Sequence, residues 1–294
     1  MYEQTLALAK SSIWCMRLDK LRTIFSMLDE RAAGISADST TLELFAADNR
    51  RRRDARNATG IGVIPVIGSI VHRGNMFTEA SGTASSDMLG KQFDMMMASG
   101  DIGTILLEID SPGGQAQGIQ ELAAKIAAGR GAKPIIAQVN PEAASAAYWL
   151  ASAADEIVVT PSGEVGSIGA YAYHLDYSAL NETMGVKPTY IAYGENKVEG
   201  NPDAPLSDSA LAEIQSRVDR VGKQFETDIA KYRGASLSTV RSDWGQGRMI
   251  DADRAKKLGM VDKIGTLDET IGRIQAGERI KRRARIEAER FKIS

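Results

Sequence analysis

The feature that most constrains the fold is an apolar, strand-like run that leads without a break into an alanine-rich helix. Residues 133–140 (KPIIAQVN) carry the strand pattern, and residues 143–154 (AASAAYWLASAA) carry small side chains suited to a buried helix. A second strand-like run at 104–110 ends in Ser-Pro-Gly-Gly, and an apolar pattern at helical spacing follows at 119–126. Strands that alternate with helices at this interval predict βαβ units and a largely parallel sheet in an α/β fold.

Further elements extend this pattern on both sides. Residues 62–71 and 187–193 have the composition of strands, and residues 87–100 that of a helix. The longest amphipathic pattern runs from 208 to 232, which we expect both to pack on the core and to reach a neighbouring subunit. Its apolar face consists of Leu211, Ile214, Val218, Val221, Phe225 and Ile229.

Ser145 stands at the turn between the strand-like run and the alanine-rich helix. Backbone N–H groups at the start of a helix have no intrahelical acceptor, and the glycines of the Ser-Pro-Gly-Gly turn leave further N–H groups accessible. A serine nucleophile needs such donors where its oxyanion forms. Ser145 is therefore the candidate nucleophile, although a serine among alanines is by itself an ordinary helix residue.

A serine hydroxyl needs a base to take its proton, and the sequence offers three candidates. His72 ends an apolar run, where a structural role is the usual one, and His174 either completes a Ser-His pair or belongs to a strand. Lys197 lies in a polar loop, where a lysine is usually only solvated. A lysine acts as a base only when burial lowers the pKa of its ammonium from about 10.4. The residue pattern alone leaves all three candidates open.

Several motifs occur in one order along residues 60–270. They are SPGG, the serine in AASAAYWLASAADEIVV, GSIGAY, the lysine of the following loop, and GRMIDADRAKKLGMVDKIG. This set resembles the S49 family of serine peptidases, signal peptide peptidase A and its phage relatives, on the ClpP/crotonase-like fold. Single-domain members carry nucleophile and base in one chain about fifty residues apart, and Ser145 and Lys197 are 52 residues apart. ClpP itself places its histidine about 25 residues after the serine, where this chain has Tyr171 or a near neighbour, which disfavours a ClpP triad.

The resemblance implies a role for each site residue, and it implies no metal, nucleotide or other cofactor. The HExxH, Cys-cluster and Walker A motifs are absent from the sequence. The implied roles are those of Ser145 (nucleophile), Lys197 (general base), Ser167 (orienting the lysine amine), Gly114 and Ala146 (oxyanion-hole amides) and Gly113 (shaping the turn).

The segment 11–34 resembles the opening segment of phage-encoded S49 proteins in Trp14, in its helical spacing and in Gly34. One helical face carries Leu18, Leu21, Phe25 and Leu28. This second resemblance implies a phage or prophage prohead protease that cleaves scaffold or capsid proteins during head maturation.

Two alternatives to the prohead protease stay open. One is a cellular S49 peptidase that degrades signal peptides, and the other is a catalytically silent capsid-assembly scaffold. The resemblance also implies a ring-like homo-oligomer, in which the substrate or a neighbouring subunit closes over the lysine.

Composition bounds the setting in which the chain works. Its 294 residues provide one α/β domain with appendages, and a formal net charge of −2 gives no overall field for nucleic acid. We find no stretch near the roughly 20 apolar residues of a membrane span and no signal-peptide pattern. The single cysteine, Cys15, excludes an internal disulfide. These features predict a cytoplasmic protein, in the host cytoplasm or the assembling prohead, that acts on polypeptides.

The sequence divides into three segments. Residues 1–58 form an N-terminal helical segment and linker, residues 59–272 the peptidase domain, and residues 273–294 a basic helical tail. The arginine run Arg50–Arg53 is typical of a solvated linker, with a contact to nucleic acid or to an acidic scaffold as the alternative.

Overall fold

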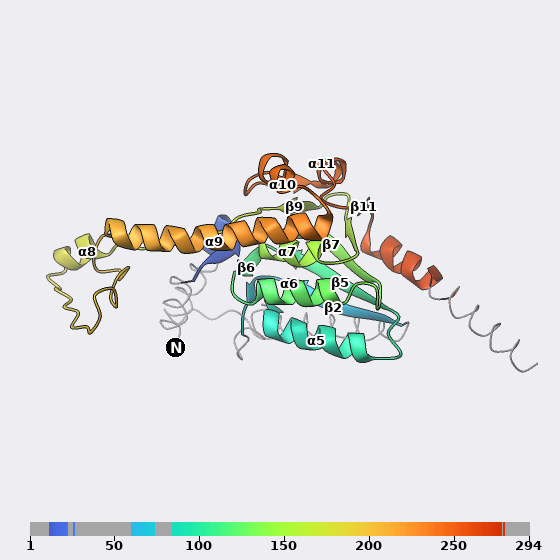
Figure 1. The fold of residues 1–294 in the computed structure, drawn as a ribbon, viewed down its shortest axis with the longest axis horizontal. Helices are drawn as coiled ribbons and strands as arrows, with labels where there is room; N and C mark the ends of the chain where they lie inside the picture. Colours follow the sequence, from blue (N-terminus) through green and yellow to red (C-terminus); the bar gives the residue numbers. More distant parts are fainter. Residues whose placement is uncertain (1–11, 23–25, 27–59, 74–83, 278, 280–294) are drawn as a thin grey trace, which may run out of the picture.

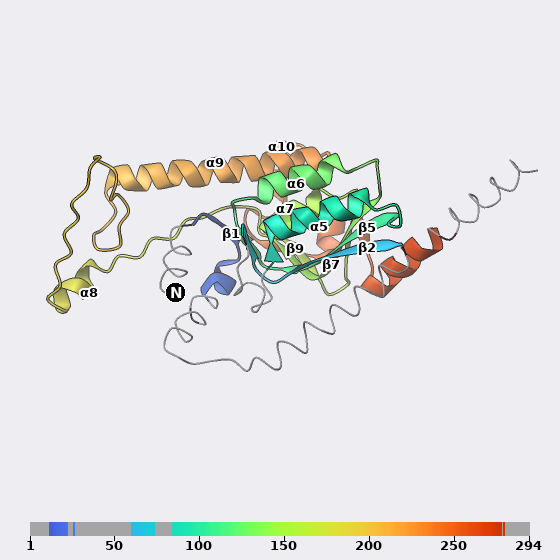
Figure 2. The same ribbon diagram turned by 90° about the horizontal axis from the view of Figure 1, so that it is seen from below.

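The computed structural model describes residues 12–22, 26, 60–73, 84–277 and 279. These residues form a body of two sheets covered by helices, from which one long arm projects (Figures 1 and 2). The predictions for Phe25, Leu28, Gly34, Arg50–Arg53 and residues 280–294 concern positions outside the described residues.

The larger sheet has seven strands and is parallel except where β10 joins it, which confirms the predicted largely parallel sheet. β7 lies at its centre between β5 on one side and β8 and β9 on the other; β8 pairs with the first half of β7 and β9 with its last residues. The strands are β2 (Ile61–Ile67), β5 (Thr104–Ser111), β7 (Ile135–Ala144), β8 (Glu156–Val159), β9 (Glu164–Gly166), β10 (Met249–Asp251) and β11 (Lys263–Ile264).

The central strands are apolar on both faces because both faces of the sheet are covered. Along β5, Ile105, Leu107 and Ile109 belong to the main core, whereas Leu106 belongs to a second cluster on the opposite face. Successive side chains of a strand point to opposite faces, so this division follows from the strand geometry. The helical residues 267–277 complete the second cluster through Ile274.

A row of helices covers the main-core face of the sheet (Figures 1 and 2). The predicted helices at 87–100, 119–126 and 208–232 are confirmed, within a few residues at each end. The helices are α5 (Ser86–Ala98), α6 (Ile119–Ala128), α7 (Ala146–Ser152), α8 (Ser178–Thr183), α9 (Asp208–Arg233), α10 (Leu237–Asp243) and α11 (Ala252–Lys257).

A smaller four-stranded sheet forms next to the carboxyl ends of the central strands. It contains β1 (Trp14–Met16), β6 (Gly113–Gln115), β3 (Ile70–Val71) and β4 (Ala84–Ser85), in this spatial order. The predicted strand at 62–71 is thus divided between β2 and β3. The strand at 14–16 was not predicted, because the apolar residues of the N-terminal segment follow a helical spacing.

The short helix α7 is held by contacts of its Trp149 side chain and of its carboxyl end. All seven of its residues are buried, and the ring of Trp149 stacks on Phe225 of α9 with centroids 4.4 Å apart. Trp149 Nε1 also donates to Asp228, whose pKa is raised by burial. At its carboxyl end, the Arg130 guanidinium donates to the carbonyls of residues 152, 153 and 154, which lack intrahelical partners. The start of α7, where Ser145 lies, is therefore fixed in place.

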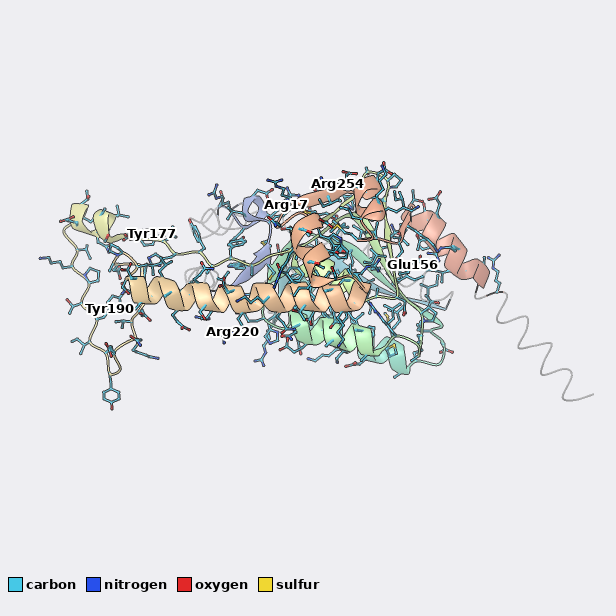
Figure 3. The ribbon with its side chains drawn as sticks, turned by 45° about the horizontal axis from the view of Figure 1, so that its top comes forward. Arg17, Glu156, Tyr177, Tyr190, Arg220 and Arg254 are labelled. Atoms are coloured by element: carbon cyan, nitrogen blue, oxygen red, sulfur yellow. The ribbon has the colours of Figure 1, made fainter. Side chains whose placement is uncertain are left out.

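The arm consists of residues 175–207 and the first half of α9 (Figures 1 and 2). The predicted strand at 187–193 is wrong, because the described chain gives this segment no neighbouring strand and it stays irregular. Ile191 is 98% exposed and Tyr193 is 102% exposed, relative to the isolated residue. Figure 3 shows Tyr190 at the far end of the molecule from Glu156.

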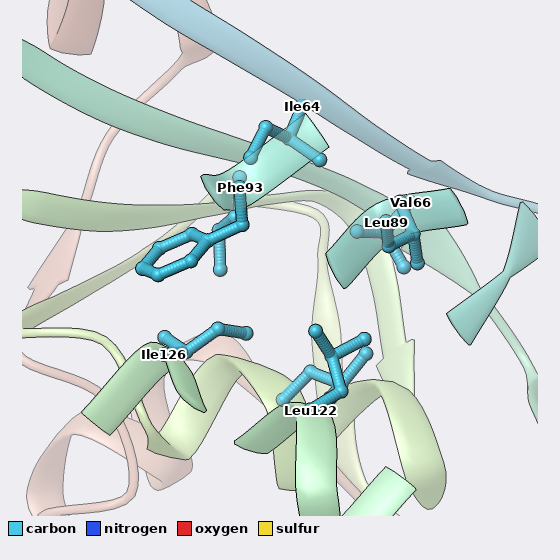
Figure 4. Close-up of a pocket in the computed structure, with 8 residues that line it drawn as sticks. Ile64, Val66, Leu89, Phe93, Leu122 and Ile126 are labelled. Carbon is cyan, nitrogen blue, oxygen red and sulfur yellow. The ribbon is translucent and has the colours of Figure 1, made fainter. Parts of the chain in front are cut away.

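The core formed by the described residues contains a small void, which Figure 4 shows between β2, α5 and α6. Its volume is about 10 Å³ and its lining is entirely apolar, so it offers room for no ligand and no polar partner for a water. Separately, no helix among the described residues has the length and apolar character of a membrane span.

The stack of Trp149 on Phe225 gives a stability prediction. Phe225→Ala should lower the free energy of unfolding by about 3–5 kcal/mol, because it empties a fully buried position and removes the partner of Trp149. Leu211→Ala is the matched control on the same helix; Leu211 is 53% exposed, and its loss should change the free energy by less than about 0.5 kcal/mol. Urea unfolding followed by Trp fluorescence measures both, and equal effects would contradict the described packing.

Candidate active site

Three motifs of the sequence meet where neighbouring parallel strands end. Ser111 at the end of β5 pairs with Ala143 of β7, and Ala144 of β7 pairs with Gly166 of β9. The carboxyl ends of parallel strands lie at one edge of a sheet, and ligands of such sheets bind outside that edge. The Ser-Pro-Gly-Gly turn, the serine turn and the Gly-Ser-Ile-Gly turn are therefore side by side.

Ser145 itself occupies the sharp turn between β7 and α7. Its backbone φ is 53°, and its N–H donates to the carbonyl of Gly166 at 2.7 Å. Its side chain is 1% exposed, and the one hydrogen bond of Ser145 Oγ within the described residues is a long one, 3.5 Å, to the carbonyl of Gly169. The hydroxyl is thus held in a buried turn without a strong local partner.

Positive φ marks both serines of the predicted site. Among the described non-glycine residues, Ser145, Ser167 and Gln246 have positive φ, and Ser167 also has a φ of 53°. The N–H of Ser167 donates to the carbonyl of Arg248 at 2.8 Å, which ties its turn to the loop before β10. Such conformations cost energy and are concentrated at functional sites. The backbone strain therefore coincides with the residues that the motifs selected.

The glycines of the Ser-Pro-Gly-Gly turn have no space for a side chain. A Cβ on Gly114 would stand 1.8 Å from the carbonyl oxygen of Ile70, and Gly113 has a φ of 95°. Ser111 fixes the turn, because its hydroxyl donates to the carbonyl of Gly68 and accepts from the N–H of Gly113. The turn therefore brings bare backbone next to Ser145.

Ala146, the second predicted oxyanion donor, is the first residue of α7 and is fully buried. A residue at this position has no intrahelical acceptor for its N–H. The structure thus brings together five of the six predicted site residues: Ser145, Ser167, Gly113, Gly114 and Ala146.

Lys197, the sixth, is not brought to Ser145 within one chain. It is exposed and lies in a turn of the arm, where its N–H donates to the carbonyl of Gly194. The arm adjoins the start of α9, and Ser207 is about 27 Å along that helix from Phe225 at 1.5 Å per residue. The described chain gives Lys197 no contact with the serine.

Neither histidine supplies the missing base by direct contact. His72 Nδ1 lies 3.2 Å from Ser86 Oγ, at the start of α5, in agreement with a structural role. His174 lies at the base of the arm, and its Nε2 is buried without a hydrogen-bond partner among the described residues. The same holds for the hydroxyl of Tyr171, whose pKa burial raises to about 12.

A groove of about 790 Å³ runs from the body to the arm. Tyr171, His174 and Ile13 line its inner end, and Leu211, Ile214 and Val218 of α9 line its outer end. The apolar face predicted for the first half of α9 therefore borders an open groove, and the helix joins the main core only from Val221 onward.

Two elements of the site were missed by the sequence analysis. One is β1, which pairs with the Ser-Pro-Gly-Gly turn through β6, and the other is Arg17, which binds Glu142 and Glu164. Trp14 was the available signal for β1, but three residues of strand propensity have no meaning until a sheet edge is present to pair with them.

Comparison with known proteins agrees with this geometry. The profile described as "Peptidase family S49" matches residues 127–281. The head-tail preconnector protein GP5 of Enterobacteria phage P21 is 33% identical over 240 residues, which cover 82% of this chain and 47% of that protein. The capsid assembly protease C of Escherichia phage lambda is 32% identical over 226 residues, covering 76% and 51%.

A third relative is a putative signal peptide peptidase SppA of Enterococcus faecium, 29% identical over 177 residues, which cover 60% of this chain and 51% of that protein. This chain thus spans about half the length of the curated relatives it matches. Its mixed α/β architecture with a mostly parallel seven-stranded sheet is consistent with the predicted ClpP-like fold. Sequence and architecture together show that the chain belongs to peptidase family S49.

Proposed function

We propose that this chain is a serine endopeptidase in which Ser145 is the nucleophile and Lys197 the general base. The observation that carries the proposal is the turn at Ser145. A buried serine with a φ of 53° starts a rigid helix, directly beside the bare backbone of Gly113 and Gly114. A turn that presents a hydroxyl and backbone N–H groups to one point is the arrangement that acyl transfer needs.

The reaction follows from these positions. The neutral lysine amine takes the proton of Ser145 Oγ, and Oγ attacks the carbonyl carbon of the scissile peptide. The N–H groups of Gly114 and Ala146 donate to the oxyanion of the tetrahedral intermediate. When the intermediate collapses, the C–N bond breaks and the lysine returns its proton to the leaving amine. Water then attacks the acyl ester by the same route and frees Ser145.

The base must reach Ser145 from the arm, and the arm is suited to contact another copy of the chain. Of the eleven large apolar residues that the described chain exposes, seven lie between residues 180 and 211. They are Leu180, Met184, Val186, Tyr190, Ile191, Tyr193 and Leu211. An exposed apolar set of this size is typical of an interaction surface. In our account, the chain forms a ring-like homo-oligomer in which one subunit's arm delivers Lys197 to the Ser145 of its neighbour.

Burial in that contact also serves the chemistry. A lysine amine is a base only when neutral, and a desolvated environment favours the neutral form. In our account, Ser167, whose turn lies beside that of Ser145, accepts a hydrogen bond from the arriving amine and orients it. The site is complete only in the assembly, which restrains proteolysis by free subunits.

The relatives favour a role in phage head assembly. The two phage proteins match at 32–33% identity over 76–82% of this chain, against 29% over 60% for the putative signal peptide peptidase. We therefore assign the substrate to the scaffold or capsid proteins of an assembling prohead in the host cytoplasm.

One prediction from this proposal tests the dyad. Ser145→Ala and Lys197→Ala should each lower peptide hydrolysis by roughly 10³-fold or more, and the double variant should be no worse, because the two residues act as one unit. His174→Ala is the matched control at a competing base and should lose at most a few-fold. Cleavage of co-expressed scaffold and capsid proteins, followed by mass spectrometry, measures all four chains.

Two results would contradict the dyad. A dead His174→Ala chain with an active Lys197→Ala chain would make this a Ser-His enzyme. Hydrolysis above a tenth of the wild-type rate in Ser145→Ala would remove Ser145 as nucleophile. Cleavage of exported signal peptides but not of capsid or scaffold proteins would leave the dyad assignment intact and contradict the assignment of the substrate.

Another prediction tests delivery of the base between subunits. Mixing the Ser145→Ala and Lys197→Ala chains in equal amounts before assembly should restore about a quarter of the wild-type activity, because a random ring places an intact serine beside a neighbour's intact lysine at that frequency. Each chain alone stays inactive. A mixture as inactive as its components would show that each subunit uses its own lysine.

A further inference from the structure

The strand β1 lies where an extended peptide would lie if it were bound beside Ser145. On one edge it pairs antiparallel with β6, and the N–H of Ala116 donates to the carbonyl of Ile13 at 3.0 Å. On its other edge, Trp14 and Tyr171 exchange two hydrogen bonds of 2.9 and 3.0 Å. β1 thus fills the gap between two backbone segments, as a peptide does in β-strand addition.

The register places the Cys15 carbonyl at the proposed oxyanion hole. Residues 13 and 17 hydrogen-bond with residues 116 and 112, so the alternation of an antiparallel ladder makes Cys15 and Gly114 the hydrogen-bonded pair between them. Gly114 carries one of the two proposed oxyanion donors. The carbonyl oxygens of Cys15 and Ala144 lie 2.2 and 2.9 Å from the point where a Cβ of Gly113 would stand. The Cys15 carbonyl is therefore next to the residue that precedes the nucleophile.

With β1 in place, the nucleophile is closed to solvent. Cys15 is fully buried, Trp14 is 4% exposed, and Ser145 is 1% exposed. Trp14 and Met16 form their own apolar cluster with Leu21 and Tyr171. A substrate cannot add to β6 while this strand occupies its edge.

An arginine holds the carboxyl end of β1. Arg17 donates to Glu142 at 2.9 Å and to Glu164 at 3.1 Å, and Asp19 also pairs with it. Glu142 is on β7 and Glu164 on β9, the two strands that lead to Ser145 and Ser167. Arg17 lies at the surface of the body near β1 (Figure 3). These ion pairs therefore connect β1 to the two strands that lead to Ser145 and Ser167.

We propose that β1 is a displaceable occupant of a peptide-binding groove, by which we mean the space between β6 and the backbone at Tyr171, and that it must leave β6 before a substrate reaches Ser145. The inference rests on the proposed function of Ser145. It also defines the substrate: an extended segment in the same register as β1, with a small uncharged side chain at the position of Cys15. That position is closed, since Cys15 is fully buried in the main core cluster together with Ala143, Ala146 and Ala147.

Cys15 provides the test, because it is the only cysteine of the chain. Burial raises the pKa of its thiol to about 12, so near pH 8 a seated β1 should hardly react with a maleimide. The Cys15 reaction reports release of the strand, and the reaction of Ser145 with a fluorophosphonate reports access to the nucleophile. Both rates are measured on the full chain.

Variants of the strand should change both rates together. Trp14→Asp and Arg17→Gln should each speed the labelling of Cys15 and of Ser145 by about tenfold or more, because they raise the population of the open state. Arg241→Gln is the matched control. It removes the ion pair between Arg241 of α10 and Glu226 of α9, and neither residue contacts β1. It should leave both rates unchanged. Thermal unfolding by circular dichroism checks that each variant is folded. If Trp14→Asp does not fold, Arg17→Gln alone provides the test.

A peptide tests the groove without relying on catalysis. In the Ser145→Ala chain, the synthetic peptide SIWAMR, which copies residues 12–17 with alanine for Cys15, should compete with β1 and speed maleimide labelling of Cys15. A scrambled peptide should have no effect. Suppose that no chain with an intact Ser145 reacts with the fluorophosphonate, while the peptide still speeds the labelling of Cys15. Ser145 would then not be the nucleophile, but the proposal that a peptide displaces β1 would stand.

Two results would overturn the inference itself. One is fast labelling of Ser145 while Cys15 stays protected, since the nucleophile would then be open with β1 seated. The other is a Cys15 rate that SIWAMR leaves unchanged at saturating concentration, since the strand would then be a permanent part of the sheet.

Discussion

The parallel adjacency of β5, β7 and β9 is the constraint on which the site depends. Each strand ends in a turn that carries one part of the proposed site, and the register Ser111–Ala143 and Ala144–Gly166 sets these turns beside one another. The turns are then tightened individually. Bare glycine backbone contacts Ile70, and a positive φ is imposed on both Ser145 and Ser167. Without this register the same motifs would be three unrelated surface turns.

The rest of the fold keeps that edge rigid and leaves the arm free. The Trp149–Phe225 stack and the Arg130 contacts fix α7, so the turn of Ser145 is held by contacts within one chain. The same helix α9 that supplies Phe225 extends beyond the core as the support of the arm. In our proposal, the nucleophile is rigid and the base is distant from it, as expected of a peptidase that becomes active on assembly. In the further inference proposed above, the strand β1 adds a second restraint on activity, by occupying the edge of β6.

The local sequence pattern was sufficient to predict the helices and strands that pack in the core. The strand at 104–110 and the helix at 119–126 were predictable because their apolar periods record which faces are covered. The serine turn was predictable from the motif order. The segment 187–193 shows the limit: strand propensity describes a residue's fit to a sheet, and the described chain offers that segment no sheet to join. For β1 the reverse applies, since three residues of weak pattern become a strand through β6 and Tyr171. The separation of Lys197 from Ser145 in space could not be predicted either, because a spacing of 52 residues along the chain does not determine where the arm projects.

Peptide mapping of a fluorophosphonate adduct on the assembled chain tests the central claim most directly. The account predicts a single adduct, on the peptide that contains Ser145, and its loss in the Lys197→Ala assembly. The competing serines are Ser86, which contacts His72, and Ser167, which shares the site. An adduct on either of them, or an assembled chain with no adduct at all, would contradict the assignment of Ser145 as the nucleophile.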